Sequence, residues 1–188
     1  MTVLDSPSAL ASARRGQNER ARPKNEGQMT KEKLPVTQAV RMLRAEKVEF
    51  SLHAYKYVEK GGTAVAAEML SLDEHQIVKT MVMEDGSGEP LLILMHGDKR
   101  VSTKALARNL GVKTVRPCDP QQAYKHTGYL VGGISPFGTR KPLKVCVEQT
   151  ILGLQKIYIN AGKRGLLAEI SPKDLVRVLK PKSVKVSN

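Results

Sequence analysis

Two apolar segments separated by a short polar turn, in the middle of the chain, restrict the possible folds most strongly. Residues 77–83 (IVKTMVM) and 90–96 (PLLILMH) flank the turn EDGSGE, whose Asp and Gly residues are typical of a β-hairpin. Helical patterns precede and follow this hairpin along the chain. A hairpin among helices predicts a mixed sheet with helices packed on it, and argues against a simple βαβ repeat. We therefore expect an α/β fold of the mixed α+β kind in a single domain.

Capping residues predict where several helices begin. The first helix is expected at Thr37, before QAVRMLRAEK, and another runs from Ser102 to Gly111. Ser171 precedes a helix in which Asp174 is expected to complete a capping box. The remaining patterns predict short helices in TAVAAEMLSL and DPQQAYKHTG, an alternating segment in VEFSLHAYKY, and strands at 143–147, 156–160 and 166–170.

Composition divides the chain into tails and a domain. Residues 1–34 lack an apolar period and are expected to be a disordered basic tail, followed by the domain at 35–182 and a C-terminal tail at 183–188. Hydrophobic residues make up 40% of the chain and aromatic residues 4%, so one largely aliphatic core is expected. No apolar run approaches the ~20 residues of a membrane span, and no secretory signal is expected. Cys118 and Cys146 lie far apart, which favours reduced thiols in the cytoplasm.

The net charge of +13 favours a polyanionic partner, most simply a nucleic acid. A merely basic surface is the alternative. No helix-turn-helix, zinc finger or aromatic RNA-binding stripe is present in the sequence. We therefore expect the protein to contact phosphates and to recognise the shape of the nucleic acid, without reading base edges through a standard module.

Lys79 stands in the middle of an otherwise apolar strand. An unpaired buried charge is costly, so the ammonium should reach water or meet an anion. Strand alternation places it on the same face as Met81 and Met83, with Thr80 on the other face. Two outcomes are open: Lys79 lines a cleft and contacts an anionic ligand, or it pairs with a nearby acid such as Glu68.

A glycine-rich segment, TGYLVGGISPFGTRKPL at 127–143, is the strongest candidate for a binding loop. Adjacent glycines permit close backbone approach, and Pro136 biases Ser135 toward an extended conformation. Such a loop can aim N–H groups at an oxygen atom, although an ordinary surface turn is the alternative. The segment NAGKRG places Lys163 and Arg164 on a second loop, which suits phosphate or is simply a solvated hairpin tip.

Standard catalytic patterns are missing from the sequence. The four histidines show no metal-ligand spacing, and we expect neither a metal nor another cofactor. No G-x-S-x-G motif supports a serine nucleophile, and no pair of carboxylates lies near the glycine-rich loop. If the chain is an enzyme, its chemistry must depend on backbone dipoles, Lys79 and the substrate itself.

Five segments carry a resemblance to a known family. In their order along the chain they are TQAVRML, FSLHAYKY, VKTMV, DPQQAYKHTGYLVGGISPFG and YINAGKRGLLAEI. Together they resemble the YbaK-type family of aminoacyl-tRNA editing proteins, the cysteinyl-tRNA(Pro) deacylases. These are free-standing relatives of the prolyl-tRNA synthetase insertion domain. The resemblance covers about residues 37–179. It implies a mixed, partly barrel-like sheet surrounded by helices, and an enzyme that removes the wrong amino acid from mischarged tRNA(Pro). Prolyl-tRNA synthetase is a further expected partner, and whether tRNA identity is read here or by that partner stays open.

The resemblance also implies roles for individual residues. Lys79 and Gly132 are the expected catalytic residues: the lysine meets the tRNA 3′ end, and the backbone of the Gly132–Pro136 loop holds the ester carbonyl. The substrate thiol is thought to attack its own ester and form a thiolactone. The expected substrate-binding residues are Tyr55, Thr80, Gly133, Ser135, Pro136, Asn160, Lys163 and Arg164.

Two positions depart from the cysteine-specific pattern, in which Ser and Asp occur where this chain has Asn160 and Leu167. Both positions line the amino-acid pocket in those relatives, so a deacylase for another small amino acid such as alanine stays an alternative. A tRNA-binding module without catalysis and a structural domain with an incidental basic surface are the second and third hypotheses.

Overall fold

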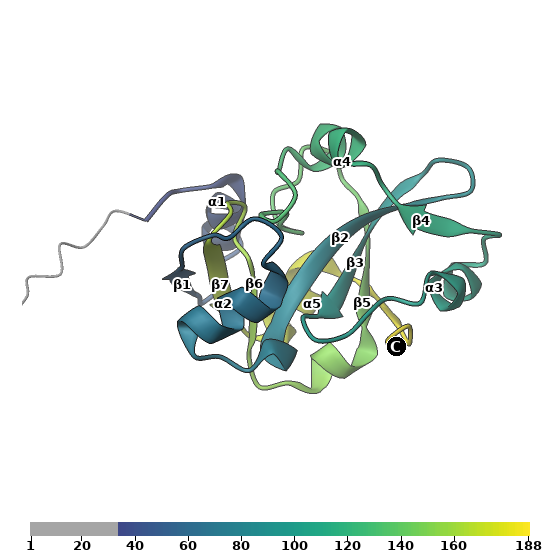
Figure 1. Cartoon of the computed structure of the whole chain (residues 1–188). Helices are drawn as coiled ribbons and strands as arrows, with labels where there is room; N and C mark the ends of the chain where they lie inside the picture. The colour runs from purple at the N-terminus through teal and green to yellow at the C-terminus, as the bar shows by residue number, and fades with distance from the viewer. Residues whose placement is uncertain (1–33) are drawn as a thin grey trace, which may run out of the picture. The chain divides into compact units, whose positions relative to one another are not determined.

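The structure is a computed structural model that describes residues 34–188, so the tail expected at 1–34 lies outside the described residues except for Leu34. Within the described part, eight strands form one open mixed sheet, which confirms the mixed α+β class (Figure 1). The strands are β1 (Ser51–Ala54), β2 (Ile77–Asp85), β3 (Pro90–His96), β4 (Val115–Pro117), β5 (Lys144–Glu148), β6 (Ile157–Asn160), β7 (Leu166–Ile170) and β8 (Lys182–Val184).

The strand order is β1-β7-β6-β2-β3-β5-β8, and β4 pairs with the end of β2. The predicted hairpin is formed by β2 and β3, in antiparallel register from Val78 opposite His96 to Glu84 opposite Pro90. β2 pairs with β6 in parallel, as β3 does with β5 and β5 with β8. Strands β4 and β8 were not predicted, because each has only three residues and no alternating pattern of its own.

The helices begin where polar side chains can cap them. Thr37 Oγ1 accepts a hydrogen bond from Val40 N at 3.1 Å, and Ser102 Oγ accepts one from Ala105 N at 3.2 Å. The capping box expected at Asp174 is wrong, because its carboxylate accepts hydrogen bonds from Arg177 instead. The helices are α1 (Gln38–Ala45), α2 (Gly62–Leu70), α3 (Thr103–Leu110), α4 (Pro120–Thr127) and α5 (Pro172–Leu179), with 3-10 turns η1 (Glu74–Gln76) and η2 (Gln149–Gly153).

Each face of the sheet is covered by different helices. One face packs its alternate residues, such as Val78, Leu94 and Ile159, against α1, α5 and the segment after α4. On the other face, α3 covers the β3–β5–β8 side and α2 covers Ile77 and Leu167. The core is mainly aliphatic, as the composition predicts.

Residues 183–188, expected as a C-terminal tail, are packed against the domain. Val184 and Val186 are buried, and Asn188 exchanges backbone hydrogen bonds with Arg100. The Glu148 carboxylate accepts hydrogen bonds from the N–H groups of Val186 and Ser187 at 2.7 and 2.8 Å, which holds this segment beside β5. None of the helices described at 34–188 has the length and hydropathy needed to cross a membrane.

Candidate functional site

One edge of β2 lacks a strand partner over a short stretch, and this break positions the candidate site. β2 pairs with β6 only at Ile77 and Val78, and it pairs with β4 only from Met83 onward. Between these points lie residues 79–82, including Lys79 and Thr80, which have β3 on one side. β6 ends at Asn160, whereas β2 continues to Asp85. The separation of β2 and β6 therefore leaves space for a ligand.

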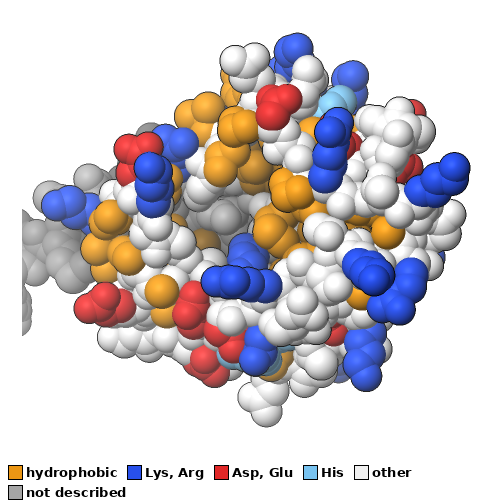
Figure 2. Space-filling view, turned by 45° about the vertical axis from the view of Figure 1, so that its right-hand side comes forward, with side chains coloured by type: hydrophobic (Ala, Val, Ile, Leu, Met, Phe, Trp, Pro, Cys, Tyr) orange, Lys and Arg blue, Asp and Glu red, His pale blue; other side chains and the backbone are white. Residues whose placement is uncertain are grey.

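A cavity of about 450 Å³ opens at this break, within the usual size range of small-molecule sites. In the space-filling view, hydrophobic side chains gather around a hollow, with Lys and Arg side chains beyond them (Figure 2). The lining residues come from four separate parts of the chain: Tyr55, Tyr57, Glu59, Lys60, Gly62, Thr63, Ala66, Ile77, Lys79, Thr80, Val131, Gly132, Ile134, Asn160, Arg164 and Leu167. Six of the predicted site residues are thus brought together. Gly133, Ser135, Pro136 and Lys163 are not among the lining residues.

Lys79 lines this cavity, and its ammonium is hydrogen-bonded to backbone oxygens. Nζ donates to Gly97 O at 2.9 Å and to Lys99 O, both in the segment after β3. In the described part of the chain, no carboxylate forms an ion pair with Lys79, so the alternative pairing with Glu68 does not form. Burial lowers the pKa of Lys79 below its ordinary value, against the opposing charges of Glu74 and Asp98.

The glycine-rich segment is packed into the domain, so it is not an ordinary surface turn. Residues 133–137 are buried, and the Tyr129 hydroxyl donates to Phe137 O at 2.7 Å. Gly132 stands at the cavity with φ +90°, and a Cβ there would meet Tyr57 Oη at 2.9 Å. Within residues 34–188, the N–H groups of Gly132 and Ile134 make no hydrogen bond. Both residues line the cavity, so these N–H groups are candidates to bind an oxygen atom of a ligand.

Ser135 and Pro136 support this loop from inside. Both are buried, and Ser135 Oγ accepts a hydrogen bond from Phe137 N at 3.3 Å. A Cβ on Gly133 would meet Arg164 N at 2.6 Å, so the two loops touch through their backbones. These residues shape the loop without lining the cavity.

Arg164 links the glycine-rich loop to Tyr57, and all three line the cavity. Its Nε donates to Val131 O at 2.8 Å, and its guanidinium lies 5.0 Å from the centre of the Tyr57 ring. Tyr55, which lines the cavity beside Tyr57, has its pKa raised by burial and by the nearby Tyr57. Lys163 is exposed beside Arg164. This position is compatible both with a contact to phosphate and with a solvated hairpin tip.

Two buried polar atoms in the cavity wall lack a hydrogen-bond partner in the described residues. They are Thr80 Oγ1 and Asn160 Oδ1. Buried polar groups are rarely left unpaired, so these atoms indicate where a polar ligand group could bind. Leu167 packs nearby against Ala66 and Ile77, which makes that part of the wall apolar.

The lining residues limit the chemistry of the site. Among the described residues that line it there is no Ser, Cys or His. Neither Cys118 nor Cys146 lines it, and burial raises both thiol pKa values, that of Cys118 to about 11. The site offers hydrogen-bond donors and the cations of Lys60, Lys79 and Arg164, beside the carboxylate of Glu59. Donors and cations can polarise a carbonyl and bind an anionic ligand.

The sequence predictions missed Tyr57, Thr63 and Ile134 as lining residues. Tyr57 could have been found, because it alternates with Tyr55 along VEFSLHAYKY. Ile134 carries an apolar side chain that gives no signal of a site, and its backbone N–H is the group that matters. Thr63 enters through the start of α2, whose place over β2 depends on tertiary packing.

A family model described as "Aminoacyl-tRNA editing domain" matches residues 59–178. A protein of Enterococcus faecalis named "Putative Cys-tRNA(Pro)/Cys-tRNA(Cys) deacylase EbsC" is 28% identical over 141 residues, covering 74% of this chain and 86% of that protein. The proline–tRNA ligase of Desulfotalea psychrophila is 29% identical over 97 residues, which is 52% of this chain but 16% of the ligase.

Solved structures show the same fold. A hypothetical protein matches with a TM-score of 0.74 and 27% identity, over 81% of this chain and all of the other. A "putative trans-editing enzyme for prolyl tRNA synthetase" matches with a TM-score of 0.70 and 21% identity, over 80% of this chain and 95% of the other. Since the family model covers more than half of the residues, the chain belongs to the aminoacyl-tRNA editing domain family.

Proposed function

We propose that this protein is a trans-editing deacylase that removes cysteine from mischarged tRNA(Pro). One observation carries the proposal: Lys79, the unpaired N–H of Gly132 and the unpartnered oxygens of Thr80 and Asn160 all border one cavity. An ester carbonyl, a ribose and an α-ammonium offer the complementary groups. The name of the Enterococcus faecalis relative supports the same substrate. We expect a protein with this activity to act in the cytoplasm.

The residues have distinct roles in this proposal. The N–H groups of Gly132 and Ile134 hold the ester carbonyl oxygen and stabilise the charge that develops on it. The Lys79 ammonium contacts a ribose or phosphate oxygen of the tRNA 3′ end, and Thr80 and Tyr55 bind the same end. Asn160 Oδ1 accepts a hydrogen bond from the α-ammonium of the amino acid. Lys163 contacts a backbone phosphate outside the cavity.

The bond changes need no nucleophile from the protein. The cysteinyl sulfur attacks its own ester carbon, the bond from that carbon to the tRNA 3′ oxygen breaks, and that oxygen leaves as a hydroxyl with the proton that the thiol lost. The four-membered thiolactone then takes up water to give cysteine. Holding the ester in one conformation favours this intramolecular step. Attack by water on the same carbonyl is the alternative route and yields cysteine directly.

Alanine is the second candidate for the amino acid. Leu167, Ala66 and Ile77 make one wall apolar, and such a wall accepts a methyl group as readily as a thiol. A substrate whose side chain cannot attack the ester would require the water route. Release of alanine would therefore require the water route, whereas release of cysteine is compatible with both routes.

A panel of tRNA(Pro) charged with cysteine, alanine or proline tests the proposal. The full chain should release cysteine fastest and leave proline in place. Lys79→Ala should lower the rate by about 100-fold, because the tRNA end is no longer held in position. Lys173→Ala removes an exposed lysine of α5 and should leave the rate unchanged.

The outcomes separate the competing functions. Release of alanine in preference to cysteine would assign the alternative substrate. Salt-sensitive tRNA binding without release would assign a binding module. An unaltered rate for Lys79→Ala would remove that residue from the reaction. Repeating the panel with prolyl-tRNA synthetase present shows whether the synthetase supplies tRNA recognition.

A further inference from the structure

The Lys79 ammonium is bound by the segment after β3, residues 97–99, and this segment is itself closely packed. An ammonium has three N–H groups, and Gly97 O and Lys99 O accept two of them. The third remains for the cavity that Lys79 lines. The position of Gly97–Lys99 therefore decides where that last N–H points.

Gly97 is packed too closely for any larger residue. Its N–H donates to Ile77 O at 2.6 Å, and a Cβ would meet Glu74 O at 2.7 Å and Thr63 Cβ at 2.9 Å. Thr63, which lines the cavity, donates to Glu74 at 2.7 Å. The segment after β3 is thus packed against both η1 and the start of α2.

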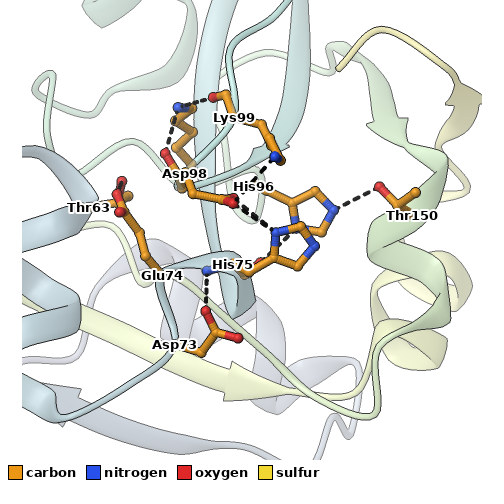
Figure 3. Close-up of polar contacts among 10 residues, drawn as sticks. Thr63, Asp73, Glu74, His75, His96, Asp98, Lys99 and Thr150 are labelled. Carbon is orange, nitrogen blue, oxygen red and sulfur yellow. Dashed lines mark hydrogen bonds and ion pairs between the residues drawn. The ribbon is translucent and has the colours of Figure 1, made fainter. Parts of the chain in front are cut away.

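Asp98 and His75 link the same segment to η1 (Figure 3). The two Asp98 carboxylate oxygens lie 3.0 and 3.1 Å from His75 Nδ1, which donates because a carboxylate only accepts. The His75 ring stacks on His96, with ring centres 3.7 Å apart and planes 13° from parallel. His96 is buried, with its own ring nitrogens 2.6 Å from His75 O and 2.8 Å from Thr150 Oγ1.

These three side chains could suggest a metal site, since their ligand atoms lie within 4.8 Å of one another. The stacking argues against it. An imidazole binds a metal in the plane of its ring, and a metal in the plane of one stacked ring lies outside the plane of the other. Both nitrogens of His96 also have partners.

We propose that the Asp98–His75 pair, supported by His96, is a positioning device that holds the Gly97–Lys99 carbonyls and so aims the Lys79 ammonium into the cavity. The inference rests on the proposed function, in which Lys79 contacts the tRNA end. Asp98 and His75 do not line the cavity, so they act through Lys79 and not on the substrate. The charges of Glu74 and Asp98 raise the pKa of Lys79, and that of Arg100 lowers it. Although burial alone would raise the pKa of Asp98, its hydrogen bond with His75 and nearby positive charge lower it.

The test compares Asp98→Ala with Asp98→Asn. Alanine removes the acceptor for His75, whereas asparagine keeps one. We expect Asp98→Ala to lower kcat for deacylation by about 10-fold or more with a smaller change in KM, and Asp98→Asn to recover most of it. Asp174→Ala breaks a 2.7 Å ion pair on α5, and serves as the matched control with unchanged activity.

A second measurement observes Lys79 without any substrate. Hydrogen bonds slow the exchange of ammonium protons with water, so the full chain should give a distinct Lys79 Nζ signal by ¹⁵N NMR, identified by its loss in Lys79→Met. Asp98→Ala should broaden or remove this signal, and Asp98→Asn should retain it. Thermal unfolding of each variant separates this effect from loss of folding.

The two measurements distinguish the possible failures. An unchanged Lys79 signal with parental kcat in a folded Asp98→Ala protein would overturn the positioning role. A changed signal in a protein that deacylates no tRNA would support the positioning role and contradict the proposed function. A Lys79 signal lost equally in Asp98→Ala and Asp98→Asn would also overturn the proposal, because hydrogen bonding by residue 98 would then not be what matters.

Discussion

His96 is a buried ionisable side chain whose hydrogen bonds specify one neutral form. Since His75 O can only accept, Nδ1 of His96 must carry the proton and Nε2 must accept from the Thr150 hydroxyl. Burial lowers the pKa of His96 below 6.5, with the neighbouring His75 charge acting in the same direction. A proton added to Nε2 would require the Thr150 hydroxyl to turn and accept a hydrogen bond in place of donating one.

This arrangement predicts a loss of stability in acid. The unfolded chain binds a proton at His96 near pH 6.5, whereas the folded protein resists it until a lower pH. The free energy of unfolding should therefore fall as the pH drops below 6.5. His96→Gln cannot take up that proton, so its loss should be smaller. Urea unfolding at about pH 7.5 and about pH 5.5 measures both losses, and parallel losses would contradict the prediction.

At the level of single residues, the sequence predicted Lys79 as a site residue but not how it is held. Charge and strand pattern alone indicated that its ammonium needs a partner. The partners are backbone carbonyls of Gly97 and Lys99, and every residue has a carbonyl. The sequence of side chains therefore gives no indication of which carbonyls bind the Lys79 ammonium. Asp98 and His75 are equally hidden, since their pairing depends on how η1 meets the end of β3.

At the level of elements, the glycine-rich loop and the 163–165 loop meet through their backbones. A Cβ on Gly133 would lie 2.6 Å from Arg164 N. Because Arg164 N is a backbone atom, it cannot easily move to relieve this contact. Gly153, at the end of η2, has nothing within 4 Å of an added Cβ. The two glycines form a matched pair for testing this contact.

We predict that Gly133→Ala destabilises the protein by about 1–3 kcal/mol through overpacking, and lowers deacylation by moving the N–H groups of Gly132 and Ile134. Gly153→Ala should change stability by less than about 0.5 kcal/mol and leave the rate intact. Urea unfolding and the release of cysteine from tRNA(Pro) measure the two effects. Equal behaviour of the two variants would show that the contact between the loops is unimportant.

Most elements could be predicted because their signals are local. The hairpin turn between β2 and β3 and the caps at Thr37 and Ser102 are encoded within a few residues. β4 and β8 are three residues long and are specified by the strands they join. The break between β2 and β6 that opens the cavity is also non-local, because the pairing of distant strands creates it.

At the level of the whole molecule, the net charge of +13 predicts salt-sensitive binding to tRNA. If two phosphates are neutralised, affinity should fall about tenfold between about 50 and about 200 mM salt. Filter binding or fluorescence anisotropy with the full chain measures this. Heparin serves as the control polyanion. Equal affinity for heparin and tRNA(Pro), with the same salt dependence, would favour an incidental basic surface.

The cavity is lined by residues from Tyr55 to Leu167, which lie in segments separated by long stretches of chain. Contacts between residues distant in sequence form late, because closing a large loop costs entropy before the stabilising contacts have formed. No single hairpin or helix pair contains enough of the lining to bind an aminoacyl ester. A nascent or partly unfolded chain therefore presents no working fragment of the site, and recovery of deacylation during refolding would report the completed fold, not an intermediate.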